Sequence, residues 1–212
     1  MNNTPQPHLF WGSASPLAAL SGGGLLIMAT VRLSYAIIAG FSLIWVYGLS
    51  VLIFHAAARG LPRRGIVMVQ TFLASLMAGL YLLVIWILTP ITALETFFVV
   101  SLVPIFCISS GIFQRSAAAD DTVEALTRAI SEAVVLSVLL LAFSLVREPL
   151  GFLSLSVPGG SRGIAFIFSV ATEALFPVQL IASSSGALIL LGYGLGLYRY
   201  YRNLNAPQEA DV

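Results

Sequence analysis

Glu132 and Arg128 are the ionisable residues best placed to act on an ion inside a membrane. If a helix begins near Thr122, Glu132 lies ten residues along it, about 15 Å at roughly 1.5 Å per residue. That depth approaches the middle of a bilayer, where a carboxylate is costly and usually functional. These two residues are therefore candidates for an ion path. Alternatively, Glu124, Arg128 and Glu132 form a ladder of ion pairs near the membrane surface, because they recur every four residues.

Two glycine- and proline-interrupted segments form the second candidate site. The triplet Gly22, Gly23 and Gly24 removes side chains and permits unusual dihedral angles, or it is a loop or a close helix contact. The matching break in the second half of the chain is marked by Pro104, Cys107, Ser109, Ser110 and Gly111. The alternative there is a proline-kinked helix whose serine hydroxyls bond to backbone carbonyls.

Cys107 is the chain's single cysteine, which rules out an intrachain disulfide and leaves no metal site made by cysteine alone. A lone cysteine in an apolar run is more often a small buried hydrophobe than a ligand. We assign no metal or cofactor from the residues alone. No nucleophile–base pair or phosphate-binding loop is visible, so a self-contained enzyme is the least favoured class.

The elements that must position these residues are apolar helices. Four runs contain no Asp, Glu, Lys or Arg: Leu33–Ala58, Gly65–Leu94, Thr96–Gln114 and Ala174–Tyr198. About 20 apolar residues in a helix span a bilayer core of roughly 30 Å. Hydrophobic residues make up 58% of the chain and charged residues 9%, and the net charge of +1 gives no reason to expect a nucleic-acid partner. The sequence predicts a multi-pass membrane protein whose surroundings are the lipid bilayer.

The predicted fold is an all-α membrane protein with six transmembrane helices in one domain, residues 1–212. A short polar N-terminus (1–8) and a C-terminal tail (203–212) flank the spans, which are Leu9–Val31, Ser34–Ala58, Ile66–Leu88, Thr96–Phe113, Thr122–Val146 and Ala174–Tyr198. The interrupted first and fourth segments occupy equivalent positions in two three-helix halves. This placement predicts two inverted repeats, with the functional site where the breaks meet at the midplane.

Arginines predict the orientation of the spans. The side holding both termini carries seven of them, and the other side carries three: Arg32, Arg147 and Arg162. The positive-inside rule therefore predicts that both termini are cytoplasmic. Glu95, Glu173 and the pair Arg147-Glu148 fall at the predicted ends of spans, where we expect interfacial side chains.

The order of these features resembles the six-helix integral subunits of the Rnf and Na⁺-translocating NADH:quinone reductase (Nqr) complexes, specifically the Rnf E/Nqr D type. The likeness covers roughly residues 15–203. It rests on the helix order, on the segment from Pro104 to Arg115, and on Arg147-Glu148-Pro149-Leu150-Gly151. This last string matches a family element in which Arg-Glu, two residues and Gly follow the fifth helix.

The resemblance implies a subunit of an ion-translocating electron-transport complex in a bacterial inner membrane, with other Rnf/Nqr-like subunits as partners, including an inverted homologue. In the family, each such subunit contributes two cysteines to an iron–sulfur centre, which normally needs four. Those positions fall on Gly24 and Ser110 here, and Cys107 lies three residues before the second. Cluster binding is therefore not carried over. The alternatives are a stand-alone small transporter and a structural or assembly membrane protein.

Overall fold

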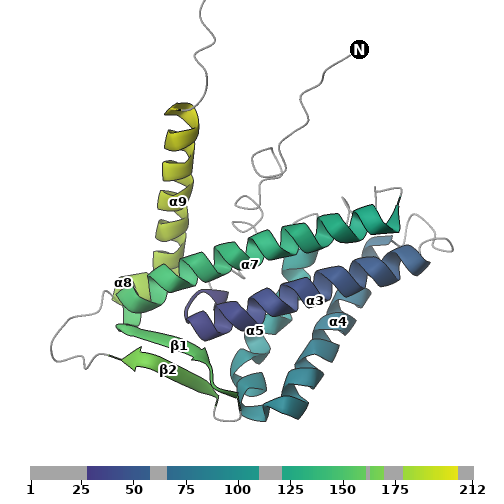
Figure 1. The fold of residues 1–212 in the computed structure, drawn as a ribbon, viewed down its shortest axis with the longest axis horizontal. Coiled ribbons are helices and arrows are strands. Elements are labelled where there is room, and N and C mark those ends of the chain that lie inside the picture. The colour runs from purple at the N-terminus through teal and green to yellow at the C-terminus, as the bar shows by residue number, and fades with distance from the viewer. Residues whose placement is uncertain (1–27, 58–65, 110–120, 161–162, 170–178, 205–212) are drawn as a thin grey trace, which may run out of the picture.

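The computed structural model describes residues 28–57, 66–109, 121–160, 163–169 and 179–204, and these carry the account below (Figure 1). Four long helices dominate: α3 (Leu33–Ala57), α4 (Ile66–Leu88), α5 (Pro90–Ser109) and α7 (Thr122–Phe152). Each is long and apolar enough to cross a membrane, with a mean hydropathy between 2.2 and 2.4 over its most apolar stretch. The predicted helical fold is confirmed in its coarse form: the described part of the chain is mostly helical, with four helices that could span a membrane.

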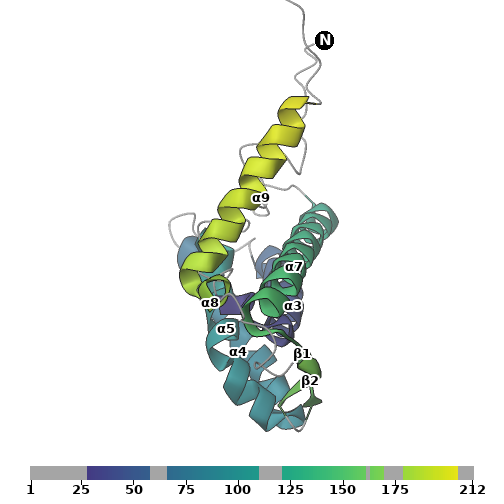
Figure 2. The same ribbon diagram turned by 90° about the vertical axis from the view of Figure 1, so that its left-hand side faces the viewer.

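Helices α3 and α7 lie side by side and antiparallel (Figures 1 and 2). The face of α7 toward α3 has a small buried residue at every fourth position: Ala125, Ala129, Ala133 and Ser137. A Cβ atom added to Gly40 of α3 would lie 3.1 Å from the Cβ of Ser137. Small residues at such a spacing let two helix backbones approach closely within a membrane.

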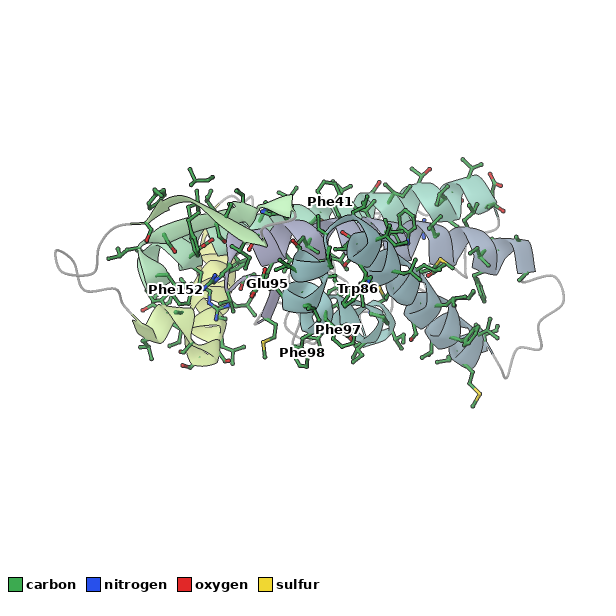
Figure 3. All side chains as sticks on the ribbon, turned by 90° about the horizontal axis from the view of Figure 1, so that it is seen from below. Phe41, Trp86, Glu95, Phe97, Phe98 and Phe152 are labelled. Atoms are coloured by element: carbon green, nitrogen blue, oxygen red, sulfur yellow. The ribbon has the colours of Figure 1, made fainter. Side chains whose placement is uncertain are left out.

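Helices α4 and α5 form a second antiparallel pair, joined only by Thr89. Pro90 starts α5, where its missing N–H costs nothing because the first turn has no helical acceptor. Helix α4 packs on α3 through Tyr81, whose hydroxyl donates to the carbonyl of Ile38 at 3.2 Å. Much of the rest of the pair is exposed, including Phe97 and Phe98, so apolar side chains face outward (Figure 3).

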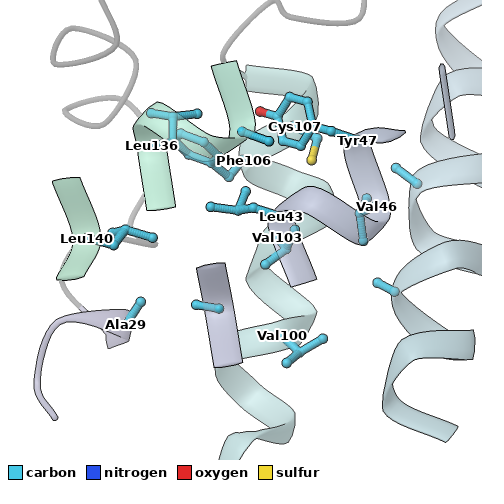
Figure 4. Packing of buried hydrophobic residues seen from close by; sticks show 14 of the residues in the cluster. Ala29, Leu43, Val46, Tyr47, Val100, Val103, Phe106, Cys107, Leu136 and Leu140 are labelled. Carbon is cyan, nitrogen blue, oxygen red and sulfur yellow. The ribbon is translucent and has the colours of Figure 1, made fainter. Parts of the chain in front are cut away.

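The buried core lies where α3, α5 and α7 meet (Figure 4). Leu43 and Tyr47 of α3, Phe106 of α5 and Leu136 of α7 are each at most 1% exposed. Cys107 lies beside Tyr47 in this core. The core therefore joins helices from both halves of the chain.

A two-stranded antiparallel hairpin follows α7: β1 (Ser154–Pro158) and β2 (Ile164–Ser169). It corrects the prediction of an all-α fold, which contained no strands. Gly160 and Gly163 have φ angles of 64° and 79°, which the turn requires and which glycine adopts without a Cβ penalty. Helix α7 ends when Leu153 takes a left-handed conformation and its N–H bonds to the carbonyl of Pro149.

The described part of the predicted sixth span is two helices rather than one. Helix α8 (Gln179–Ala182) and helix α9 (Ser184–Leu204) are separated by Ser183. Ser183 Oγ accepts the N–H of Gly186 at 3.3 Å, which is the bond of a helix N-cap. Helix α9 then leads away from α3 and α7 (Figures 1 and 2).

Other predicted boundaries need correction. Helix α5 begins at Pro90, six residues before the predicted start, and is uninterrupted at Pro104 within its described range. Helix α7 continues six residues past Val146 to Phe152. The predicted first span lies almost wholly outside the described residues, as do Ser110 and Gly111.

Candidate functional site

Arg147 is the most completely bonded side chain in the described part of the chain, and it is 1% exposed. Its Nε donates to the carbonyl of Ile181 at 2.9 Å, and its Nη2 donates to the carbonyls of Ala182 and Ser183 at 2.8 and 2.9 Å. Its Nη1 donates to Thr30 Oγ1 at 2.8 Å. The carbonyls of Ile181 and Ala182 lie at the end of the short helix α8, where helical donors run out. The carbonyl of Ser183, between α8 and α9, also accepts the N–H of Ala187. Arg147 therefore satisfies polar backbone that an apolar environment would otherwise leave exposed.

Glu148 is fully buried and acts on a different element. Its Oε2 accepts the N–H of Leu33, the first residue of α3, at 2.6 Å. The first N–H groups of a helix have no partner inside it, and the helix dipole favours a negative charge there. Its other oxygen, Oε1, is buried with no hydrogen-bond partner, and so is Ser144 Oγ one turn earlier on α7. The hydrogen bonds of Glu148 and Arg147 thus run to different elements.

Two serines complete the same region. The N–H of Ser34 donates to Ser156 Oγ at 3.4 Å, and the Ser156 hydroxyl donates to Ser34 Oγ at 3.2 Å. Strand β1 thus supplies the acceptor for the second N–H of α3. We call the side chains of Thr30, Ser34, Ser144, Arg147, Glu148 and Ser156 the polar cluster. It joins α3, α7, α8 and the hairpin.

The hairpin also reaches α5 at this end of the molecule. Thr92 Oγ1 donates to the carbonyl of Gly160 at 2.9 Å. The guanidinium of Arg32 lies 5.4 Å from the ring centroid of Phe166 and 5.8 Å from that of Phe152, a favourable cation–π arrangement. The starts of α3 and α5 and the end of α7 therefore lie at one end of the bundle.

The predicted half-helix site is described only in its second part. Gly22, Gly23, Gly24, Ser110 and Gly111 lie outside the described residues, so they stay predictions. Pro104 and Cys107 are buried on α5, and Cys107 is 0% exposed. The hydroxyl of Ser109 donates to the carbonyl of Phe106 at 3.2 Å, as expected for a serine bonded to its own helix.

The predicted ion-path residues lie on the other half of α7. Arg128 Nη2 is 3.0 Å from Glu124 Oε1, with both side chains largely exposed, which is the first step of the ion-pair ladder. Glu132 is half-buried one turn further on. Helix α7 has 31 residues, about 46 Å, and exceeds a bilayer core of roughly 30 Å. Its charged first turns therefore suit the membrane surface, and a role of Glu132 in an ion path stays a prediction.

The polar cluster was missed by sequence reasoning, which expected Arg147 and Glu148 at the interface beyond the helix. The structure instead buries both inside α7 and directs them to different helix ends. One signal was available: opposite charges side by side, next to Pro149, directly after an apolar helix. Their partners are 34–36 residues downstream and 115–117 residues upstream, a pairing that local pattern does not reveal.

Among the described residues, no group of three or more His, Cys, Asp or Glu side chains could hold a metal ion. The acceptor atoms of the polar cluster are all oxygens, since the nitrogens of Arg147 only donate, and oxygen acceptors suit a proton or a hard cation. Neither a scan against protein-family models nor a search of curated proteins finds a match for this chain.

Proposed function

We propose that this chain is an integral subunit of an Rnf/Nqr-like, ion-translocating electron-transport complex in a bacterial inner membrane. The observation that carries the proposal is the Arg147-Glu148 element. It is the most specific part of the sequence resemblance, and both side chains are buried where α3, α7 and α8 meet. A membrane protein keeps two buried charges at such a junction only where they are needed, because each is expensive to bury.

The proposed architecture is the six-helix inverted repeat, with interrupted first and fourth helices and both termini in the cytoplasm. Support comes from the alternation of the described spans, since α3 and α5 start at the end of the bundle where α7 finishes. The positive-inside rule supports the orientation through the uneven distribution of arginines. The natural partner of such a subunit is an inverted homologue that packs across the half-helices.

The proposed role within the complex is that of scaffold and ion path rather than electron carrier. The family's cysteine positions correspond to Gly24 and Ser110, and the one thiol, Cys107, lies in the packed core. One thiolate does not supply the ligands of an iron–sulfur cluster. Electron transfer is therefore assigned to partner subunits.

A pull-down of the tagged, full-length protein in mild detergent tests this proposal. Mass spectrometry identifies the partners, and iron is measured on the same sample. We expect Rnf-type subunits to co-purify with iron. Rnf-type subunits without iron would support a complex whose redox centre has been lost, and recovery of the chain alone would contradict the proposal.

A stand-alone small transporter is the second candidate. It is favoured by the absence of both family cysteines and by the buried carboxylate of Glu148, of which one oxygen has no hydrogen-bond partner. Cation flux into proteoliposomes that contain this chain alone would support it. An absence of flux, together with recovery of the chain without partners, would favour a structural or assembly role.

A further inference from the structure

Two buried oxygen atoms on neighbouring turns of α7 have no hydrogen-bond partner: Glu148 Oε1 and Ser144 Oγ. Both residues are 0% exposed. Because they are four residues apart, their side chains lie on the same face of the helix, one turn from each other. Unsatisfied polar atoms are rare inside proteins, and two of them together indicate that a bound species supplies the missing interactions.

Pro149 adds a third oxygen at the same level of α7. A proline inside a helix has no N–H, so the carbonyl of Leu145, four residues earlier, lacks its usual helical donor. Leu145 lies between Ser144 and Glu148 in the sequence. A carboxylate oxygen, a hydroxyl and a carbonyl thus occur within five consecutive residues.

The charge of this region determines what it can bind. Glu148 is a buried carboxylate, which needs a compensating charge. The guanidinium of Arg147 is directed at the carbonyls of α8 and at Thr30 instead. The N–H of Leu33 occupies only Oε2. Because Arg147 already brings one positive charge to this region, a monovalent cation at Oε1 leaves less excess positive charge than a divalent ion would.

We propose that Glu148 Oε1, Ser144 Oγ and the Leu145 carbonyl bind one monovalent alkali metal cation, for which sodium is the probe used below. Hard cations prefer carboxylate, hydroxyl and carbonyl oxygens, and freed carbonyls in membrane helices bind such ions in transporters. The site lies beside the start of α3, because Glu148 also accepts the N–H of Leu33. A bound ion would therefore stabilise the contact between α3 and α7. The inference deepens the proposed ion-translocating function and rests on it for the use of the bound ion.

Thermal unfolding of the purified full-length chain in detergent provides the test. Cys107 is the only cysteine and is fully buried, so labelling by a thiol-reactive fluorophore reports unfolding without any added probe site. A cation that binds only the folded state raises the Tm as its concentration rises. We expect sodium chloride to raise the Tm by several degrees over choline chloride at equal ionic strength. Equal Tm values in the two salts would overturn the proposal.

Three variants locate the effect. Ser144→Ala removes one ligand and breaks no recorded hydrogen bond, and we expect it to weaken sodium binding at least tenfold. Glu148→Gln keeps an acceptor for the N–H of Leu33 and is expected to abolish the sodium-dependent rise. Ser50→Ala is the matched control, because Ser50 Oγ is also buried without a partner but lies on α3 away from the site. Its sodium response is expected to equal that of the wild type.

The outcomes also separate this site from the proposed complex. If no ion binds, Ser144→Ala only removes an unsatisfied hydroxyl, and it would raise the Tm equally in both salts. That result would overturn the site even if Glu148→Gln fails to fold. Sodium binding by the isolated chain is measured without partners, so failure to co-purify Rnf-type subunits would contradict the complex and leave the site standing.

Discussion

Helices α3 and α4 have almost the same mean hydropathy, 2.3 and 2.2, yet they occupy very different environments. In the most apolar stretch of α3, 61% of residues are buried, against 22% in α4. Helix α3 packs against the small-residue face of α7, whereas α4 presents large apolar side chains such as Met68 and Phe72 to the outside. Hydropathy therefore identifies a span, and the placement of small and polar residues determines whether it lies inside the bundle.

The same contrast applies to polar side chains. Between α3, α7 and α8, polar groups bond across elements that are far apart in sequence, as Arg147 and Ser137 do. On the outer pair, Thr71 and Ser101 bond only to carbonyls of their own helix. Substitutions at the contact between α3 and α7 should therefore lower the free energy of unfolding. Equivalent substitutions on α4 and α5 should leave it almost unchanged.

The largest effect is expected for Arg147→Met. The substitution keeps an apolar stem but removes the donors to three partly buried carbonyls and to Thr30. Leaving such groups without partners should destabilise the fold by about 3–5 kcal/mol. The stability of Arg147→Lys should lie between that of Arg147→Met and that of the wild type, because an ammonium group lacks the planar fork of donors that a guanidinium has.

Equilibrium unfolding in mixed detergent micelles measures this loss. Arg128→Met on the same helix is the control, since Arg128 is largely exposed and paired only locally. Equal losses of unfolding free energy in the two variants would contradict a stabilising role of the polar cluster.

A smaller effect is expected from Gly40→Ala at the contact between α3 and α7. The new Cβ would lie 3.1 Å from the Cβ of Ser137 and 3.2 Å from its Oγ, so the helices must separate slightly. Overpacking of this kind costs about 1–3 kcal/mol. Gly79→Ala on α4 is the matched control, because no atom lies within 4 Å of its new Cβ.

Since alanine is the better helix former, we expect Gly79→Ala to be neutral or stabilising. The same unfolding measurement compares the two variants. A Gly40→Ala protein as stable as Gly79→Ala would show that the two helices do not approach as closely as described.

The contrast also explains what the sequence could predict. Helix α4 was predicted from Ile66 to Leu88 and has these bounds, because a helix whose large apolar side chains face outward is defined by its apolar run alone. The start of α5 was placed too late, since Glu95 was taken as a boundary although it lies within the helix, beside the hairpin turn at Gly163. A single charged residue therefore does not mark the end of a helix here, since Glu95 is exposed and still lies within α5.

The polar cluster and the hairpin were not predicted for a related reason. The extension of α7 past Val146 depends on carbonyls of α8, and the start of α3 depends on Glu148 and Ser156. These partners come from distant parts of the chain. In hindsight, the glycines at 159, 160 and 163 between two short apolar runs indicate a hairpin turn.

Ser137→Ala is expected to have a modest effect. Ser137 Oγ bonds to the carbonyl of Ala133 in its own helix and to that of Gly40 on α3. Hydrogen bonds between membrane helices contribute about 0.6 kcal/mol on average. Ser101→Ala on α5 is the control, because its hydroxyl bonds only to the carbonyl of Phe97. A loss confined to Ser137→Ala in the unfolding measurement would support the bond across the interface, and equal values would contradict it.

The smallest effect is expected at the charged start of α7, and it sharpens the comparison between Glu148 and the residues first predicted to carry ions. Glu124 and Arg128 form an exposed pair one turn apart, for which a double-mutant cycle should give a coupling of about 0.3–0.5 kcal/mol. Because exposed charges are screened, the coupling should vanish in about 1 M salt. A coupling that persists there would mean that this end of α7 is shielded from water.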